Sequence, residues 1–412
     1  MTGRYKSYPE YKESGIEWLK QMPSHWNKMK AKHIFKRMQR PTRSQDGVVT
    51  AFRDGEVTLR SNRRTDGFTN STKEIGYQGV RKGDLLVHAM DGFAGAIGVS
   101  DSDGKCSPVC SVCIPWSSDA IVTKYYGYLV RQLAVTDYIT SLAKGIRERS
   151  TEFRFNEFSN LFLAVPPTEE QKKIVDFLEQ EISKINLLIA KQELLVKLLQ
   201  EKRWGLVSEA VNSSDVQAYR IGHVTEQMLR EYQHIQDQEV ITLGLYNRGR
   251  GIFEKEPKLS QDLGDSDFYY VEEGDLILSG QFAWEGSIAI ADDIHCNSLV
   301  SHRYPVLRGK QGTLDTNFLW AYLTTKEGHF ILNENSVGSA GRNRPLNIRT
   351  LLKEKIFIPS LEQQSKVAKF VKVEKRINEK IKEQIIQLNE RKVALISAVV
   401  TGKIDVRDWG SK

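Results

Sequence analysis

Arginine, lysine, asparagine and glutamine gather in a few short segments of this sequence, most of which also contain glycine. Arginine can pair with guanine, and asparagine or glutamine with adenine, through two hydrogen bonds each, while further basic side chains hold phosphates. Neighbouring glycines permit turns that bring the backbone close to a ligand. These segments predict nucleic-acid contacts; the alternative is that they are solvated surface loops. The candidates are Arg60, Asn62, Arg63, Arg64, Lys144, Arg147, Arg149, Asn247, Arg248, Arg250, Gln281, Arg342, Asn343 and Arg344.

The net charge agrees with a polyanionic partner. The chain has 412 residues and a formal charge of +7. The segment from Met1 to Arg64 is much richer in Lys and Arg than in Asp and Glu. A local basic excess of this kind favours a binding surface for a polyanion.

Motifs of two enzyme classes that act on nucleic acids are missing from the sequence. A methyltransferase motif of the form Asn/Asp-Pro-Pro-aromatic does not occur, because Pro166-Pro167 stand between Val165 and Thr168. No segment fits the phosphate-binding pattern G-x-x-x-x-G-K-[ST]. The acidic group Glu272-Glu273-Asp275 reads as a solvated turn, since the first copy of the repeat described below has Arg81, Lys82 and Asp84 at the same steps. We therefore expect no catalytic residue in this chain.

Three of the four cysteines are close enough in sequence to raise the question of a metal site. Cys106, Cys110 and Cys113 have no fourth ligand at a familiar interval. We expect buried reduced thiols and no metal. The start of the chain lacks the apolar core of a signal peptide, and no apolar run is long enough to span a membrane, so we expect a cytoplasmic protein.

Two long helices must position the candidate segments. Residues Thr168 to Val211 and Ser360 to Val400 carry apolar side chains at alternating steps of three and four, the pattern of a coiled coil. Each predicts a helix of about 60 Å at 1.5 Å per residue. The natural partner of each helix is the other.

The two helices are copies of one pattern. Shifting the first stripe by 192 residues places it on the second, and Gln192 then meets Gln384; near the end the shift falls to 189. A polar pair in an apolar seam fixes the register of two helices. We expect Gln192 and Gln384 to form such a pair; the alternative is that both face a groove or solvent.

The segments before the helices repeat as well. Gly274 to Asp292 matches Gly83 to Asp101 at a constant shift of 191 residues, with Phe93 at the place of Trp284. Either aromatic could lie in a core or beside a base. The loop within this repeat differs between copies, so different base preferences could reside there, with Gln281 as the exposed candidate.

The sequence thus contains two copies of one unit, a mixed α/β globule followed by a long helix. It predicts an α/β (α+β) fold with two similar target-recognition globules separated by two long antiparallel helices that form a coiled coil, with pseudo-twofold symmetry. The first fifteen residues read as poorly ordered. The expected division is residues 1–166 for an N-terminal segment and first globule, 167–211 for the first helix, 212–358 for the second globule, and 359–412 for the second helix and tail.

This layout resembles the specificity subunit of Type I restriction-modification enzymes. Local phrases are also similar to that family: GIEWLKQMPSHW near the start, PPTEEQKKIVDFL and IPSLEQQSKVAKFV where the helices begin, and ALISAVVTGKIDV at the end. The resemblance covers nearly the whole chain, and the globules match in layout more than in residues.

The resemblance implies a non-catalytic subunit that recognises DNA. Each globule would read one half of a bipartite double-stranded target, and the helix pair would set the gap. Two modification (methyltransferase) subunits and restriction (nuclease and translocase) subunits would be the partners, and S-adenosylmethionine, ATP and Mg would be used only there. An alternative is a helical-hairpin scaffolding protein with nonspecific DNA affinity, and a weaker one is the recognition half of a split single-chain restriction enzyme.

Overall fold

The computed structural model describes residues 5–63, 74–116, 120–142, 153–338 and 344–410. The chain divides into two compact units, described one at a time. Unit 1 contains Met1–Ala190 and Ile385–Lys412, and unit 2 contains Lys191–Gln384. Each unit holds part of both long helices.

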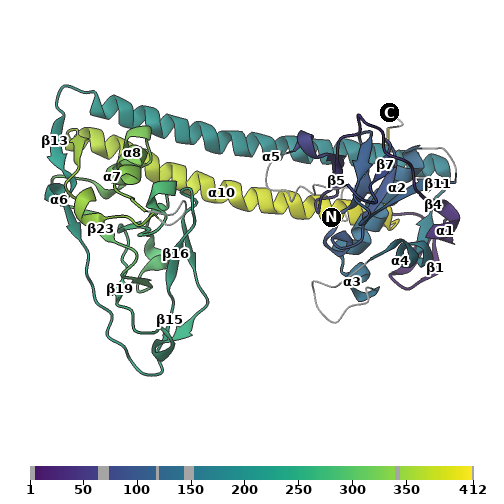
Figure 1. The fold of residues 1–412 in the computed structure, drawn as a ribbon, viewed down its shortest axis with the longest axis horizontal. Coiled ribbons are helices and arrows are strands. Elements are labelled where there is room, and N and C mark those ends of the chain that lie inside the picture. The colour runs from purple at the N-terminus through teal and green to yellow at the C-terminus, as the bar shows by residue number, and fades with distance from the viewer. Residues whose placement is uncertain (1–4, 64–73, 117–119, 143–152, 339–343, 411–412) are drawn as a thin grey trace. The chain divides into compact units, whose positions relative to one another are not determined.

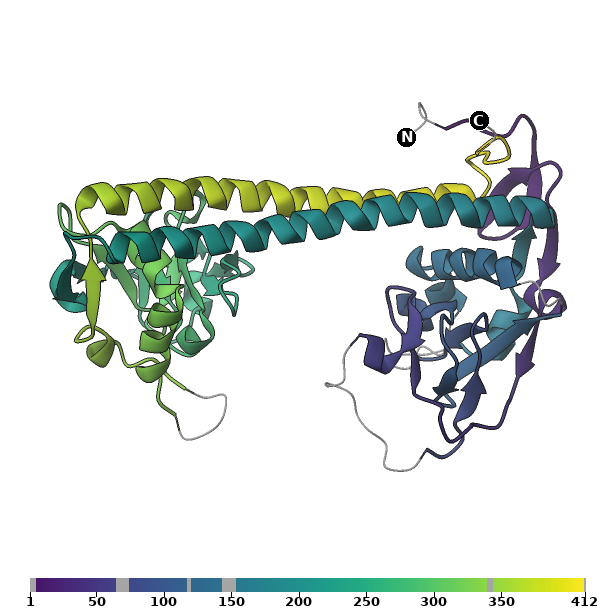
Figure 2. The same ribbon diagram turned by 90° about the horizontal axis from the view of Figure 1, so that it is seen from above.

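The long helices are α5 (Thr168–Val211) and α10 (Leu361–Val400). Their extents confirm the prediction from the heptad pattern to within one residue. Both first turns are closed in the same way, since Gln171 Nε2 donates to the Pro166 carbonyl over 2.8 Å and Gln364 Nε2 donates to the Pro359 carbonyl over 2.9 Å. The two helices pack against each other in each unit (Figures 1 and 2).

Unit 1 is built on a four-stranded antiparallel sheet with the order β4-β11-β8-β9. Helix α2 packs on this sheet, and short two-stranded pairs complete the unit. Besides the long helices, its helices and strands are β1 (Tyr11–Ile16), β2 (Leu19–Pro23), β3 (Asn27–Lys30), α1 (Ala31–Ile34), β4 (Phe35–Met38), β5 (Val49–Ala51), β6 (Val57–Leu59), β7 (Gln78–Val80), β8 (Leu85–His88), β9 (Ile97–Val99), β10 (Gly104–Cys106), β11 (Cys110–Pro115), α2 (Ala120–Val135), α3 (Tyr138–Leu142), α4 (Phe155–Asn160) and β12 (Phe162–Val165).

Unit 2 repeats this topology. Its four-stranded sheet has the order β14-β23-β20-β21, and α7 packs on it as α2 does in unit 1. Besides the long helices, its helices and strands are β13 (Gln217–Arg220), α6 (Ile221–Val224), β14 (Thr225–Gln227), β15 (Glu239–Val240), β16 (Leu243–Leu245), β17 (Ile252–Glu254), β18 (Lys258–Leu259), β19 (Phe268–Tyr270), β20 (Leu276–Leu278), β21 (Ile288–Ile290), β22 (Leu299–Ser301), β23 (Val306–Gly309), α7 (Thr316–Leu323), α8 (Lys326–Glu334), α9 (Ile348–Leu351) and β24 (Lys355–Ile358). The duplicated α/β plan predicted from the sequence is thus confirmed.

The main core of unit 1 joins the two ends of the chain. Trp26 on the N-terminal side and Val400 and Val406 on the C-terminal side belong to one buried cluster with residues of α2 and α5. The prediction that the first fifteen residues are poorly ordered is wrong for the described part, because Tyr8 is buried and β1 starts at Tyr11.

A buried carboxylate at the start of α5 anchors this N-terminal segment. Glu170 accepts hydrogen bonds from Tyr8 Oη (2.5 Å), Trp26 Nε1 (2.8 Å) and His25 Nε2 (2.7 Å). The Arg407 guanidinium of the C-terminal tail lies 5.1 Å from the Tyr8 ring centroid. Polar contacts and core packing together hold both chain ends on α5.

Candidate nucleic-acid interface

The first basic cluster lies on the turn after β6 in unit 1. Arg60 Nε donates to Thr50 Oγ1 over 3.3 Å, and Asn62 Nδ2 donates to Thr58 Oγ1 over 2.9 Å. Both side chains are thus oriented by the β5–β6 hairpin, and Asn62 is exposed to solvent.

Arg63 in the same cluster is already paired within the unit. Its guanidinium lies 2.8 Å from Asp54 and 3.4 Å from Glu56, and it stacks 4.3 Å from the Phe52 ring centroid. A DNA contact by Arg63 would compete with these two carboxylates. The other predicted contacts of unit 1, Arg64, Lys144, Arg147 and Arg149, lie outside the described residues.

The YNRGRG cluster of unit 2 forms a left-handed turn between β16 and β17. Arg248, Gly249 and Gly251 have φ values of 60°, 66° and 97°. Arg250 Nε donates to the Asn247 carbonyl over 3.0 Å, and its guanidinium lies 5.2 Å from the Tyr246 ring centroid. The turn projects Arg248 into solvent.

Arg344 is fixed against the core side of unit 2. It donates to the carbonyls of Ser336 (3.1 Å) and Asn333 (3.4 Å) and stacks 5.1 Å from the Trp284 ring centroid. Its hydrogen bonds lie at the C-terminal end of α8, and its guanidinium covers the Trp284 ring. The neighbouring Arg342 and Asn343 lie outside the described residues.

The repeated hairpin loop places its two aromatics differently. Phe93 packs against the main core of unit 1, whereas Trp284 is half-buried under Arg344. Gln281, by contrast, is exposed. Beside this loop in unit 1, His88 Nδ1 accepts a hydrogen bond from the Asp91 backbone N–H over 2.9 Å, and burial lowers the His88 pKa.

A cavity of about 370 Å³ in unit 2 adds basic residues that the sequence had not indicated. Lys255, Lys258 and Arg303 line it together with Gln281 and Phe282. Its lining contains no carboxylate among the described residues. The sequence did not indicate this group because Arg303 is 45 residues beyond Lys258 and no short motif joins the three cations.

The acidic group near β20 is an ion-pair centre. Asp275 is fully buried and accepts from Arg230 (2.7 Å) and Arg308 (2.8 Å). Asp84 of unit 1 is likewise paired with Arg40. Each aspartate also accepts the backbone N–H three residues earlier, over 2.8 Å for Asp84 and 2.9 Å for Asp275. The carboxylates thus hold the turn before the strand, which fits the sequence interpretation of a turn better than a metal site.

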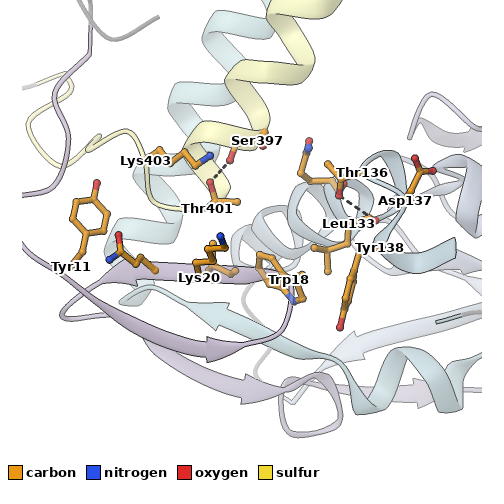
Figure 3. Close-up of a pocket in the computed structure, with 13 residues that line it drawn as sticks. Tyr11, Trp18, Lys20, Leu133, Thr136, Asp137, Tyr138, Ser397, Thr401 and Lys403 are labelled. Atoms are coloured by element: carbon orange, nitrogen blue, oxygen red, sulfur yellow. Dashed lines mark hydrogen bonds between the residues drawn. The ribbon is translucent and has the colours of Figure 1, made fainter. Parts of the chain in front are cut away.

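A larger cavity of about 730 Å³ lies in unit 1, where the β1–β2 hairpin meets the α2–α3 connection and the end of α10 (Figure 3). Trp18 Nε1 donates to the Phe162 carbonyl over 3.0 Å, and Tyr138 Oη donates to Glu17 over 2.9 Å, so two of its aromatic walls are fixed. Among the described lining residues, Asp137 is the one carboxylate and no histidine or cysteine occurs. These side chains do not form a catalytic or metal-binding constellation.

The three clustered cysteines are buried thiols, as the sequence predicts, whereas Cys296 is exposed. Cys106, Cys110 and Cys113 are free and buried. Burial raises the pKa of Cys113, and the neighbouring Cys106 and burial raise that of Cys110. Among the residues that the structure describes, no group of three potential metal ligands is present.

The helix pair contains two polar contacts in unit 2. Gln192 Nε2 donates to Gln384 Oε1 over 2.9 Å, which places the two predicted glutamines together, although Gln384 is exposed. Arg203 Nη1 donates to Glu374 Oε1 over 2.6 Å in a buried ion pair, and the Arg203 guanidinium stacks 4.6 Å from the Trp320 ring centroid. Burial raises the pKa of Glu374.

Comparison with known proteins gives the family. The Type I restriction modification DNA specificity domain matches residues 23–197 and 231–389, which is most of the chain and includes a match in each copy of the repeat. This chain belongs to that family. It is a DNA sequence-specificity subunit with two specificity domains, and the general scaffolding alternative is not favoured.

Three solved structures are similar to this chain, and the first of them supports the fold. A chain from work on complex assembly and conformational transition of the type I R-M system is 15% identical, with coverage of 93% of this chain and 99% of that chain and a TM-score of 0.58. The HsdS subunit from Thermoanaerobacter tengcongensis is 15% identical over 93% of this chain and 98% of that chain, with a TM-score of 0.44. The Type-I restriction-modification S subunit from M. genitalium is 13% identical over 91% and 96%, with a TM-score of 0.48.

Two further findings complete the comparison. A comparison of this sequence with curated proteins found no match. Within the described part of the chain, no helix is both long and apolar enough to cross a membrane.

Proposed function

We propose that each unit of this specificity subunit reads one half of a bipartite double-stranded DNA target. The observation that carries the proposal is one backbone plan present twice with different exposed side chains. A shared plan presents its loops to similar DNA surfaces, and different side chains select different bases. The predicted basic and amide residues are the proposed contacts.

The helix pair sets the length of DNA between the two halves. In this proposal α5 and α10 act as a spacer, because long helices without proline are stiff and their packed seam fixes their register. The Gln192–Gln384 hydrogen bond and the Arg203–Glu374 ion pair support a defined register in unit 2.

The helix pair also docks two modification subunits, and restriction subunits join the same complex. Apolar side chains that the helices leave exposed support this role, since larger groups of exposed apolar side chains mark protein interaction sites. They are Leu187, Leu188, Leu194, Leu195 and Leu198 on α5 and Val373, Ile386 and Val393 on α10. Methyl transfer and ATP-driven cleavage, with S-adenosylmethionine, ATP and Mg, belong to those partners, in the cytoplasm.

Selection from random DNA tests the proposal. The chain is assembled with its modification partner, and bound fragments are sequenced at physiological salt. Two short motifs at a constant distance are expected. Salt-sensitive binding without a motif would instead indicate general affinity for polyanions and would refute the reading role.

A further inference from the structure

In unit 1, backbone hydrogen bonds join three chain segments at Ala89, directly after β8; we call this site the junction. The Ala89 N–H donates to the Val109 carbonyl over 2.9 Å, and the Ala89 carbonyl accepts from the Phe153 N–H over 2.8 Å. Ala89 follows β8, Val109 precedes β11, and Phe153 comes directly after residues 143–152. Three distant segments are therefore fixed at one point.

Unit 2 contains the same junction. The Gly280 N–H donates to the Arg303 carbonyl over 2.7 Å, and the Gly280 carbonyl accepts from the Leu346 N–H over 2.8 Å. A Cβ on Gly280 would lie 2.3 Å from the Arg303 carbonyl oxygen, so the close approach requires glycine. The hydrogen bonds establish which residues are equivalent: Gly280 with Ala89, Arg303 with Val109 and Leu346 with Phe153.

The side chains at the junction have opposite chemistry in the two units. In unit 1 the position after Ala89 is Met90, whose side chain is 49% exposed, and it accompanies the half-buried Val109. In unit 2 the equivalent positions are Gln281 and Arg303, both exposed. One backbone frame thus presents an apolar pair in unit 1 and a hydrogen-bonding pair in unit 2.

The polar pair of unit 2 is available to a ligand. Neither the Gln281 amide nor the Arg303 guanidinium forms a hydrogen bond or ion pair with any described residue. Arg63 and Arg344 differ, because carboxylates hold the first and backbone carbonyls hold the second. Free donors on a fixed backbone can be used for recognition without first breaking a contact within the protein.

The surroundings of this pair fit nucleic acid. Gln281 and Arg303 line the 370 Å³ cavity with Lys255 and Lys258, and Phe282 adds an aromatic face. The two lysines, like Arg303, have no carboxylate partner among the described residues. They can hold phosphates beside the base that the polar pair contacts.

We propose that this junction determines the base preference of each half of the target. In unit 2, Arg303 and Gln281 read a purine in the major groove, since arginine bonds guanine O6 and N7 and glutamine bonds adenine N6 and N7. In unit 1, Met90 and Val109 contact the methyl group of thymine, which is the apolar feature of that groove. The inference rests on the proposed function, in which each unit reads its own half.

Exchange of the junction residues between units tests the inference. Full-length Gln281→Met/Arg303→Val, assembled with its modification partner, is compared with wild type by selection from random DNA. The expected result is loss of a purine preference at one or two positions of the second half, on the order of 10- to 100-fold. The first half and the gap stay unchanged. Arg349→Ala, an exposed arginine of α9 that does not line the cavity, is the matched control and should leave both halves unchanged.

A second variant separates base reading from charge. Arg303→Lys keeps the charge but loses the two-pronged geometry, so it should also weaken the purine preference. If lysine retains the full preference, or if both variants weaken binding to all sequences equally, Arg303 contacts phosphate and the inference fails.

The reciprocal change is a gain of preference. Met90→Gln in unit 1 should replace a thymine preference in the first half by an adenine preference. Thermal unfolding of each variant identifies misfolded protein, and an unchanged second half shows that the rest of the chain is intact. If wild type selects two motifs and the folded variants select the same two, the junction inference fails while the proposed function stands; a wild type without two motifs refutes the proposed function itself.

Discussion

Two histidines are held neutral by hydrogen bonds that they accept. His88 Nδ1 accepts the Asp91 backbone N–H over 2.9 Å, and His295 Nδ1 accepts the Asp292 backbone N–H over 3.0 Å. A protonated ring cannot accept these bonds. Burial lowers the pKa of both histidines, which agrees with this geometry.

The lowered pKa values predict a loss of stability in acid. Below about pH 6.5 the two histidines are protonated in the unfolded chain but stay neutral in the folded chain. The free energy of unfolding should therefore fall as the pH decreases below that value. Above it both states are neutral and the histidines contribute no pH dependence. The double variant His88→Asn/His295→Asn keeps a hydrogen-bond acceptor at each position but does not titrate. Denaturant unfolding at several pH values between 5 and 7 should therefore show a free energy of unfolding that changes less with pH than in wild type. An identical slope would contradict the assignment.

Residue roles were predictable from sequence only where neighbours in the chain decide them. The glutamine pair followed from the heptad pattern, because that pattern fixes which side chains face the other helix. The pairing of Arg63 with Asp54 and Glu56, and the anchoring of Tyr8 by Glu170, depend on how distant segments meet. Arg303 was missed for the same reason, because only the fold brings it beside Gly280 and Gln281.

At the scale of elements, the buried ion pair between α5 and α10 is incompletely satisfied. Arg203 and Glu374 share one contact of 2.6 Å, while Arg203 Nε and Glu374 Oε2 are buried without a hydrogen-bond partner. Burying two charges costs more free energy than a single contact returns. The pair therefore defines which residues face each other more than it stabilises the helices.

Single and double substitutions should separate these effects. Arg203→Leu leaves a buried carboxylate alone and should destabilise unit 2 by about 3–5 kcal/mol, whereas Arg203→Leu/Glu374→Leu should be close to wild type or more stable. Lys202→Ala, an exposed neighbour on α5, is the control and should have little effect. The midpoint of thermal unfolding measures the differences; equal loss in the single and double variants would show that the ion pair itself stabilises the fold.

The glutamine pair allows a test of register through DNA. Gln192→Leu/Gln384→Leu removes the polar contact and adds apolar surface to the seam, so the helices should pair as strongly but with a less unique register. Selection from random DNA should then return targets with more than one gap length. A single unchanged gap would show that the rest of the seam, including Arg203–Glu374, sets the register without the glutamines.

Boundaries of elements were predicted best where a strong period ends at proline. Pro166-Pro167 and Pro359 stop a strand and begin each long helix, and both helices were found to within one residue. Helices α2 and α3 are separated at Asp137, which has a φ of 60°, and α7 and α8 are separated at Thr324 and Thr325. Apolar periodicity continues across both breaks, so the sequence pattern did not locate them.

For the whole molecule, the spacer role predicts a relation between helix length and target. One heptad inserted into each helix, beside Ala190 in α5 and Ile385 in α10, preserves the apolar stripe and adds about 10 Å, close to three base pairs. The selected gap should lengthen by about that amount while both half-sequences stay the same. A three-residue insertion at the same places is the control variant, because it disrupts the apolar stripe. A gap that does not respond to the heptad would separate gap length from the helices.

Unit 1 is assembled from the first and the last parts of the chain, and this has a consequence during protein synthesis. Leu395, Val399 and Val406 complete its core, yet the ribosome adds them only after the whole of unit 2. Unit 2 comes from one continuous stretch and has all its core residues earlier. The usual order, in which the N-terminal domain of a nascent chain folds first, is therefore reversed here. A nascent chain that has grown only to Gln384 would therefore contain a complete unit 2 and an incomplete unit 1.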